Sequence, residues 1–224
     1  MHGHAAKQRI YEQFARIGKA LAAPGRLELI DLLAQGERSV EVLAAQVEMS
    51  VANASQHLRV LLAAHLVETR RDAQRIYYRL ASPAVIDLWL ALRRTAESQL
   101  AELPSVARAY LGDPDGFEPI DRDELARRMA AGTVVVIDVR PAEEFEQGHL
   151  AGAVSVPLET LTSWARDNAP KRKQIVAYCR GPYCVYALQA AGELKKRGLR
   201  ATRSEVGVAE WRAAGLPVEL GGAR

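Results

Sequence analysis

The spacing of apolar residues changes once along this chain, near residue 115, and the change predicts two domains of different architecture. Before that point, apolar residues recur every three or four positions, as at Ile10, Phe14 and Ile17, which is the spacing of amphipathic helices. After it, the β-branched runs "TVVVIDV" and "QIVAY" alternate with helical stretches, a pattern typical of buried parallel strands in an α/β domain. We therefore expect a first domain over residues 1–102, a linker over 103–116 and a second domain over 117–224.

The composition is that of a globular protein, with 49% hydrophobic and 25% charged residues in 224. No apolar run reaches the roughly 18 residues that a membrane span needs, and "MHGHAAKQRI" lacks the apolar core of a signal peptide. We expect a cytoplasmic protein with no membrane partner. In that compartment the two cysteines are expected to be reactive rather than joined in a structural disulfide.

Positive charge is concentrated in the first half of the chain. Residues 1–110 carry 14 Lys and Arg against 11 Asp and Glu, whereas residues 111–224 carry 16 of each. This is the mild basic footprint that a nucleic-acid-binding surface needs, although a solvated surface without a ligand would give the same count.

Two short helices with a tight break between them are expected between Ser39 and Leu62. Ser39 and Ser50 can each cap a helix, because a serine hydroxyl accepts hydrogen bonds from the free N–H groups of the first turn. The apolar face expected for the second helix consists of Val51, Ala54, Leu58, Leu61 and Leu62. The stretch "LVETRRDAQRIYYRL" then predicts a β-hairpin with an arginine-rich tip, and a closing helix follows. The first domain is therefore expected to be a winged helix-turn-helix, mainly α with a β-hairpin wing.

The stretch "SVANASQHLRVLLAAHLVETRRDAQRIYYRL" resembles the recognition helix and wing of the ArsR family of bacterial repressors. The matching residues are Ser55, His57, Leu58, Leu61, Arg71, Tyr77, Tyr78 and Leu80. The resemblance covers about residues 7–102, and it implies transcription regulation by a homodimer that binds double-stranded operator DNA. The dimer would form through the first and last helices of this domain. His65 departs from the family, which usually has a glycine at this position.

The candidate DNA-binding residues lie on the outer face of the second short helix and on the wing. A helix in the major groove presents polar side chains to base edges, and arginines suit phosphates or the minor groove. Gln56 and Asn53 can contact adenine, and Arg59 can reach guanine or phosphate. His57 could equally be a structural residue that bonds the backbone. The complete set is Ser50, Asn53, Ser55, Gln56, His57, Arg59, Arg70, Arg71, Arg75 and Tyr77.

Many ArsR proteins sense metals, but the usual ligands are missing from the matching positions here. "ERSVEVLA", before the turn, has no cysteine, and the last helix of the first domain has Asp87 but no histidine. We therefore expect no metal site and no cofactor.

The stretch "VVVIDVRPAEEFEQGHLAGAVSVPL" resembles the rhodanese domain. The matching residues are Asp138, Arg140, Glu144, Phe145, Gly148, His149, Gly152, Ala153 and Pro157, and Trp211, Gly215 and Pro217 match near the C-terminus. The resemblance covers about residues 117–220. It implies an α/β rhodanese domain with a parallel sheet and a nucleophilic cysteine.

The rhodanese nucleophile directly follows a central strand, and the matching residue here is Cys179, which begins the loop "CRGPYC". Backbone N–H groups and a helix N-terminus at such a loop favour the thiolate, which can take sulfur from thiosulfate or polysulfide and hold it as a persulfide. Pro182 removes one N–H donor. Val185 stands where cysteine-dependent phosphatases have arginine, which disfavours phosphatase chemistry. The expected site residues are Cys179, Arg180, Gly181, Tyr183 and Cys184.

Several alternatives remain open for the loop and for the whole protein. Arg180 could attract the sulfur anions, and Cys184 could resolve the persulfide or simply be a small apolar residue. Cys179 could also be an inert buried thiol. The leading hypothesis is a repressor that responds to reactive sulfur species. The first alternative is a rhodanese-type sulfurtransferase, with weak or single-turnover activity, whose DNA-binding half localises it. The second is an interaction module with both sites degenerate.

Overall fold

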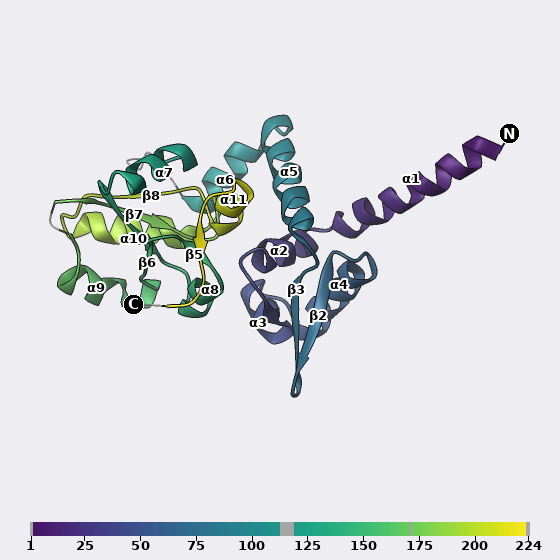
Figure 1. Cartoon of the computed structure of the whole chain (residues 1–224), viewed down its shortest axis with the longest axis horizontal. Helices are drawn as coiled ribbons and strands as arrows, with labels where there is room; N and C mark the ends of the chain where they lie inside the picture. The colour runs from purple at the N-terminus through teal and green to yellow at the C-terminus, as the bar shows by residue number, and fades with distance from the viewer. Residues whose placement is uncertain (1, 113–118, 171, 223–224) are drawn as a thin grey trace. The chain divides into compact units, whose positions relative to one another are not determined.

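The computed structural model describes residues 2–112, 119–170 and 172–222 of the chain (Figure 1). The chain divides into two compact units, Met1–Leu92 and Arg93–Arg224. The division falls inside a helix, α5 (Pro83–Gln99), so the last turns of α5 belong to the second unit. Among the helices of the described residues, none is both long enough and apolar enough to cross a membrane.

The first unit is a helical domain with a small antiparallel sheet whose strand order is β1-β3-β2. Its elements are α1 (His2–Leu21), α2 (Pro24–Leu33), β1 (Arg38–Ser39), α3 (Val40–Gln46), α4 (Val51–Ala63), β2 (Val67–Asp72), β3 (Arg75–Leu80) and the first part of α5. The helix-turn-helix is formed by α3 and α4, and the wing by β2 and β3. The predicted winged helix-turn-helix is confirmed.

Both serines predicted to cap the helix-turn-helix do so. The hydroxyl of Ser39 accepts from Val42 N at 3.5 Å, and the hydroxyl of Ser50 accepts from Asn53 N at 3.2 Å. The predicted inner face of α4 is partly wrong, because Val51 is 46% exposed and Leu62 is 37% exposed. Val51 is the first residue of the helix, and Leu62 lies beside the stripe that is buried. The buried residues of α4 are Ala54, Leu58 and Leu61.

The chain enters the wing through His65, which has a φ of +57°. This is the left-handed region, which glycine adopts without steric cost, so a histidine here accepts the conformation that the family's usual glycine would supply. The hairpin pairs Val67 with Leu80 at its base and Asp72 with Arg75 at its tip. The two-residue strand β1 adds to β3, a pairing that the sequence pattern did not predict.

Most of α1 lies outside the core of the first unit. Ile10, Tyr11 and Phe14 are exposed, and the side chain of Phe14 is 64% exposed, whereas Ala20 and Leu21 in the last turn are buried. The core is instead formed by α2, α3, α4 and the base of the wing. In the single chain these apolar residues are left uncovered, and they lie on the first of the two helices expected to form the dimer.

The second unit is an α/β domain, as predicted, around a parallel sheet with the strand order β6-β4-β7-β8. After the end of α5, its elements are α6 (Leu103–Leu111), α7 (Arg122–Ala130), β4 (Val134–Asp138), α8 (Ala142–Gln147), β5 (His149–Leu150), β6 (Val154–Ser155), η1 (Leu158–Thr160), α9 (Leu161–Asp167), β7 (Gln174–Tyr178), α10 (Val185–Lys196), β8 (Ala201–Arg203), α11 (Val208–Ala213) and β9 (Val218–Glu219). The helix α6 occupies much of the stretch 103–116 that we predicted as a linker. Residues 113–116 of that stretch lie outside the described residues.

The two faces of β7 belong to two different cores. Ile175, Ala177 and Cys179 pack with α9 and α10, whereas Val176 and Tyr178 pack with α7 and α11. This alternation follows from the two-residue period of a strand. Cys179 therefore starts the loop from the face of the sheet that α10 covers.

Candidate functional site

The two cysteines lie at opposite ends of the loop between β7 and α10, as the sequence predicted. Cys179 follows the last residue of β7 and is 1% exposed, and Cys184 caps the N-terminus of α10. A disulfide joins them across a Cα–Cα distance of 6.2 Å. Cys184 N also donates to Gly181 O at 3.2 Å. The pair is therefore close enough to bond directly, which the spacing in sequence left open.

Two glycines let the loop fold tightly. Gly181 has a φ of +150°, a conformation that favours glycine, and a Cβ there would lie 3.2 Å from Oε1 of Glu210. Gly207, which precedes α11, faces the loop from outside. A Cβ at Gly207 would overlap the carbonyl oxygen of Arg180. The loop backbone thus packs directly against the start of α11, with no space for a side chain between them.

Arg180 is paired with a carboxylate. Its Nη2 lies 2.6 Å from Oε1 of Glu144, and its Nε donates to Oε2 of Glu144 at 3.1 Å. The two side chains are only 15% and 5% exposed. Burial lowers the pKa of Arg180, but the hydrogen bonds and charge of Glu144 outweigh it, so the pKa is raised overall. The pair links the cysteine loop to α8, and the attraction of sulfur anions by Arg180 stays a prediction.

A buried polar network holds the strand end from which the loop starts. Arg140 and Asp138 are fully buried, and Nη2 of Arg140 contacts Oδ2 of Asp138 at 2.6 Å. The hydroxyl of Tyr178 donates to the same carboxylate and accepts from Leu150 N at 3.2 Å. Burial and the charge of Asp138 hold the pKa of Tyr178 well above its usual value, so the hydroxyl stays protonated. Tyr178 directly precedes Cys179, and the network therefore fixes the backbone that positions this sulfur.

The expected base-contacting residues divide into exposed and covered side chains. Asn53, Gln56 and Arg59 are exposed on α4, whereas Ser55 and His57 are partly covered. A Cβ on Gly25 of α2 would lie 3.4 Å from Nε2 of His57, so this ring packs against α2, in keeping with the structural alternative. The hydroxyl of Ser50 is used by the helix cap.

The arginines of the wing also differ in their surroundings. Arg70 pairs with Glu37 at 2.7 Å, and its guanidinium lies 4.8 Å from the ring centroid of Tyr77. Arg71 and Arg75 are exposed near the hairpin tip. The wing can therefore present Arg71 and Arg75 to a phosphate backbone, and the DNA contacts expected of Arg70 and Tyr77 stay a prediction.

Sequence reasoning missed three groups around the cysteine loop. Glu144 belonged to the rhodanese pattern but was not assigned to the site. Glu97 accepts a hydrogen bond of 2.9 Å from the hydroxyl of Tyr183, and Glu210 lies against Gly181. These three residues are distant from the loop in sequence, and the rhodanese pattern, which includes Glu144, gave no sign that any of them contacts it.

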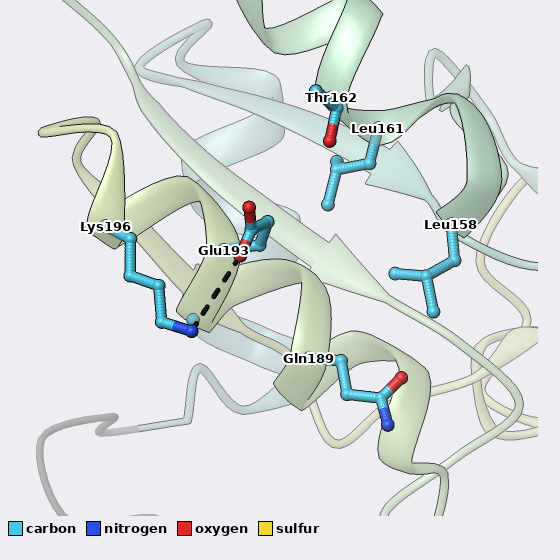
Figure 2. A pocket seen from close by; sticks show the side chains of 7 residues that line it. Leu158, Leu161, Thr162, Gln189, Glu193 and Lys196 are labelled. Atoms are coloured by element: carbon cyan, nitrogen blue, oxygen red, sulfur yellow. Dashed lines mark ion pairs between the residues drawn. The ribbon is translucent and has the colours of Figure 1, made fainter.

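A surface pocket of about 400 Å³ lies between α9 and α10 (Figure 2). Its lining consists of Leu158, Leu161, Thr162, Gln189, Gly192, Glu193 and Lys196. Lys196 and Glu193 form an ion pair at 3.9 Å across its rim. The pocket contains none of the expected site residues.

Comparison with known families agrees with the division of the chain into a winged-helix unit and an α/β unit. The family model described as "Bacterial regulatory protein, arsR family" matches residues 23–69, and the one described as "Rhodanese-like domain" matches residues 121–214. The chain is 43% identical to the HTH-type transcriptional regulator Rv0324 of Mycobacterium tuberculosis, over 96% of this chain and 94% of that protein.

Other similarities cover only part of the chain. The biofilm growth-associated repressor of Agrobacterium fabrum is 47% identical over 33% of this chain and 63% of its own length. A solution structure of a homodimeric winged helix-turn-helix domain, Mb0332 from Mycobacterium bovis, is 43% identical over 43% of this chain and 89% of its own, with a TM-score of 0.41. Because the similarity to Rv0324 spans nearly the whole chain and the two family models match in the same order as the two units, this chain belongs to the ArsR family of transcriptional regulators and carries a C-terminal rhodanese-like domain.

Proposed function

We propose that this regulator is a repressor that responds to reactive sulfur species through Cys179. The observation that carries the proposal is the bonded pair Cys179–Cys184 at the position of the rhodanese nucleophile. Two thiols within bonding reach give the protein two stable forms, an open dithiol and a closed disulfide. A repressor needs such a pair of states for a signal to select between them.

The chemistry needs only a polysulfide as oxidant. The thiolate of Cys179 attacks a terminal sulfur of the polysulfide, forms an S–S bond and expels a polysulfide one sulfur shorter. Cys184 then attacks Sγ of Cys179, loses its proton and expels the outer sulfur as hydrosulfide. Both thiols are oxidised to the disulfide, and the two electrons end on the released sulfide species.

The DNA-binding half would act as a homodimer on an operator. The exposed side chains of Asn53, Gln56 and Arg59 suit the major groove, and Arg71 and Arg75 suit phosphates. The exposed apolar residues of α1 and the outer residues Leu88 and Leu92 of α5 are the surfaces expected to pair in the dimer. Binding would weaken as salt is raised, because phosphate contacts release counterions.

The test compares binding of the reduced protein to its own upstream DNA before and after addition of inorganic polysulfide. Intact mass recorded on both samples shows whether sulfur was added or two hydrogens were lost. We expect release of wild-type protein, and no release of the Cys179→Ser variant. If Cys179→Ser is released as readily as wild type, the sensing proposal is wrong. The Cys184→Ser variant separates the two steps, because it can form the persulfide but not the disulfide.

A second candidate function is rhodanese-type sulfur transfer, favoured by the position of Cys179 after the central strand β7. Steady turnover of thiosulfate with cyanide or a thiol acceptor would support it. A reaction that stops after one event per chain, at the persulfide or at the disulfide, would support the regulator alone. The nearby Cys184 favours the second outcome, since it can remove the persulfide before an acceptor reaches it.

A further inference from the structure

We propose that the C-terminal end of α5 detects the state of the cysteine loop through a polar cluster of Arg93, Glu97, Tyr183 and Glu210. We call these four residues the α5 cluster, and all of them belong to the second unit. The proposal rests on the proposed function only for its effect on DNA binding.

The α5 cluster is held by one hydrogen bond and two ion pairs. The hydroxyl of Tyr183 donates to Oε1 of Glu97 at 2.9 Å, and Nη2 of Arg93 lies 2.6 Å from Oε1 of Glu210. Nε of Arg93 lies 3.5 Å from Oε1 of Glu97, one helical turn further along α5. Arg93 and Glu210 are only 12% and 15% exposed, so this pair is well shielded from water.

Each end of the α5 cluster touches the cysteine loop. Tyr183 directly precedes Cys184, so a shift of this sulfur moves the residue that bonds Glu97. Glu210 accepts from Gly207 N at 2.9 Å, and Gly207 packs against the carbonyl of Arg180. A Cβ on Gly181 would lie 3.2 Å from Glu210 and 3.6 Å from Nη1 of Arg93. The loop backbone cannot move toward the cluster without displacing it.

Modification of the loop requires such movement. Cys179 is 1% exposed within a packed core, so a persulfide adds a sulfur atom where no space is left. Opening the disulfide removes the covalent link between the two ends of the loop and leaves the hydrogen bond from Cys184 N to Gly181 O. In either step Tyr183 is the residue between the moving sulfur and α5.

The route to the first unit in this proposal is α5 itself. α5 is continuous from Pro83 to Gln99, and Val85 in its first turns packs in the core of the first unit. A helix transmits displacement because its backbone hydrogen bonds keep it rigid. Couplings of this kind typically change affinity by a factor of about 5 to 150.

The test is hydrogen–deuterium exchange of the full chain in the reduced state and after polysulfide treatment, followed in the peptide that covers residues 93–99. Operator affinity is measured on the same samples, and intact mass confirms complete modification in each. The variants are Glu97→Ala and Tyr183→Phe, which remove the hydrogen bond from opposite sides. The control is Glu102→Ala, an exposed glutamate of the same unit that makes no cap hydrogen bond.

We expect exchange at 93–99 to differ between the two states in wild type and in Glu102→Ala, and to differ much less in Glu97→Ala and Tyr183→Phe. The ratio of operator affinities in the two states should fall toward one in the same two variants. Equal exchange in both states of wild type overturns the proposal, even if DNA is released. A full wild-type difference retained in both variants also overturns it. A difference in exchange without any change in operator affinity supports the α5 cluster and refutes the proposed sulfur-responsive repressor.

Discussion

Replacing Glu144 with glutamine tests whether the ion pair with Arg180 holds the cysteine loop in place. The substitution keeps the shape and one carbonyl acceptor but removes the negative charge. Arg180 would then keep a guanidinium that is only 15% exposed and has lost its carboxylate. The loop should open more often, because opening returns this charge to water.

The size of the effect follows from the burial of the pair. Removing one partner of a fully buried ion pair costs about 3–5 kcal/mol. The glutamine amide can still accept a hydrogen bond and Arg180 is partly exposed, so we expect about 2 kcal/mol. Since each 1.4 kcal/mol is about a tenfold change, the opening equilibrium should rise by a factor of about 30.

The assay uses the burial of Cys179. In a Cys184→Ala background Cys179 is the only thiol of the chain, and it is 1% exposed. Its rate of labelling by an aromatic disulfide is proportional to the population of the open loop when closing is fast. We expect labelling to be about 30-fold faster in Glu144→Gln.

A double-mutant cycle with Arg180→Met separates the pair from other effects. If the pair holds the loop, the two changes together should accelerate labelling less than the product of the single changes. Additivity within about 0.5 kcal/mol would mean that the two side chains act independently. That result would refute the anchoring role of Arg180.

Three other predictions follow from the structure. Gly207→Ala should destabilise the second unit by about 1–3 kcal/mol, because its Cβ would overlap the carbonyl of Arg180, and thiol labelling of Cys179 would measure the loss. On DNA, Arg71→Ala should weaken binding to all sequences and lower the slope of log affinity against log salt by about one unit, as expected for a phosphate contact. Gln56→Ala should cost about 1–3 kcal/mol on the operator alone, as expected for a base contact. Equal losses on operator and random DNA for both variants would contradict the base contact assigned to Gln56. Burial and the neighbouring Glu97 raise the pKa of Tyr183 to about 12, so the stability that its neutral form contributes is complete below pH 10 and is lost as the pH rises through 12. Tyrosinate absorbance of wild type minus that of Tyr183→Phe should titrate near pH 12, and titration near pH 10 would contradict this environment.

Local sequence patterns predicted the helices and strands well where the apolar residues follow one clear spacing. The spacing in α4 and the serines at 39 and 50 fixed the helix-turn-helix, and the β-branched runs fixed β4 and β7. The same spacing failed at Val51 and Leu62, because burial also depends on which neighbour lies above each turn. The strand β1 has two residues, too few to show any period.

The chemistry of the site was predictable only in part. The position of Cys179 after a strand follows from sequence, since strand and loop are contiguous. The partner of Arg180 could not be predicted from the sequence, because Glu144 is 36 positions away. An isolated arginine in a loop gives no sign of whether a carboxylate compensates its charge. Tyr183 and Glu97 are 86 positions apart, and only the packing of the folded unit brings them together.

The long exposed stretch of α1 would tie the folding of this protein to its concentration if α1 pairs in the proposed homodimer. Residues 3–16 are all exposed in the single chain, so this part of the helix gains no stability from a core. Isolated helices of about 12–15 residues are marginal in water. If the proposed homodimer forms through α1, dilution below its dissociation constant should unravel α1 first, with a loss of far-ultraviolet ellipticity before the rest of the unit melts. Protein level and helix content would then be linked, and the melting temperature would rise with concentration.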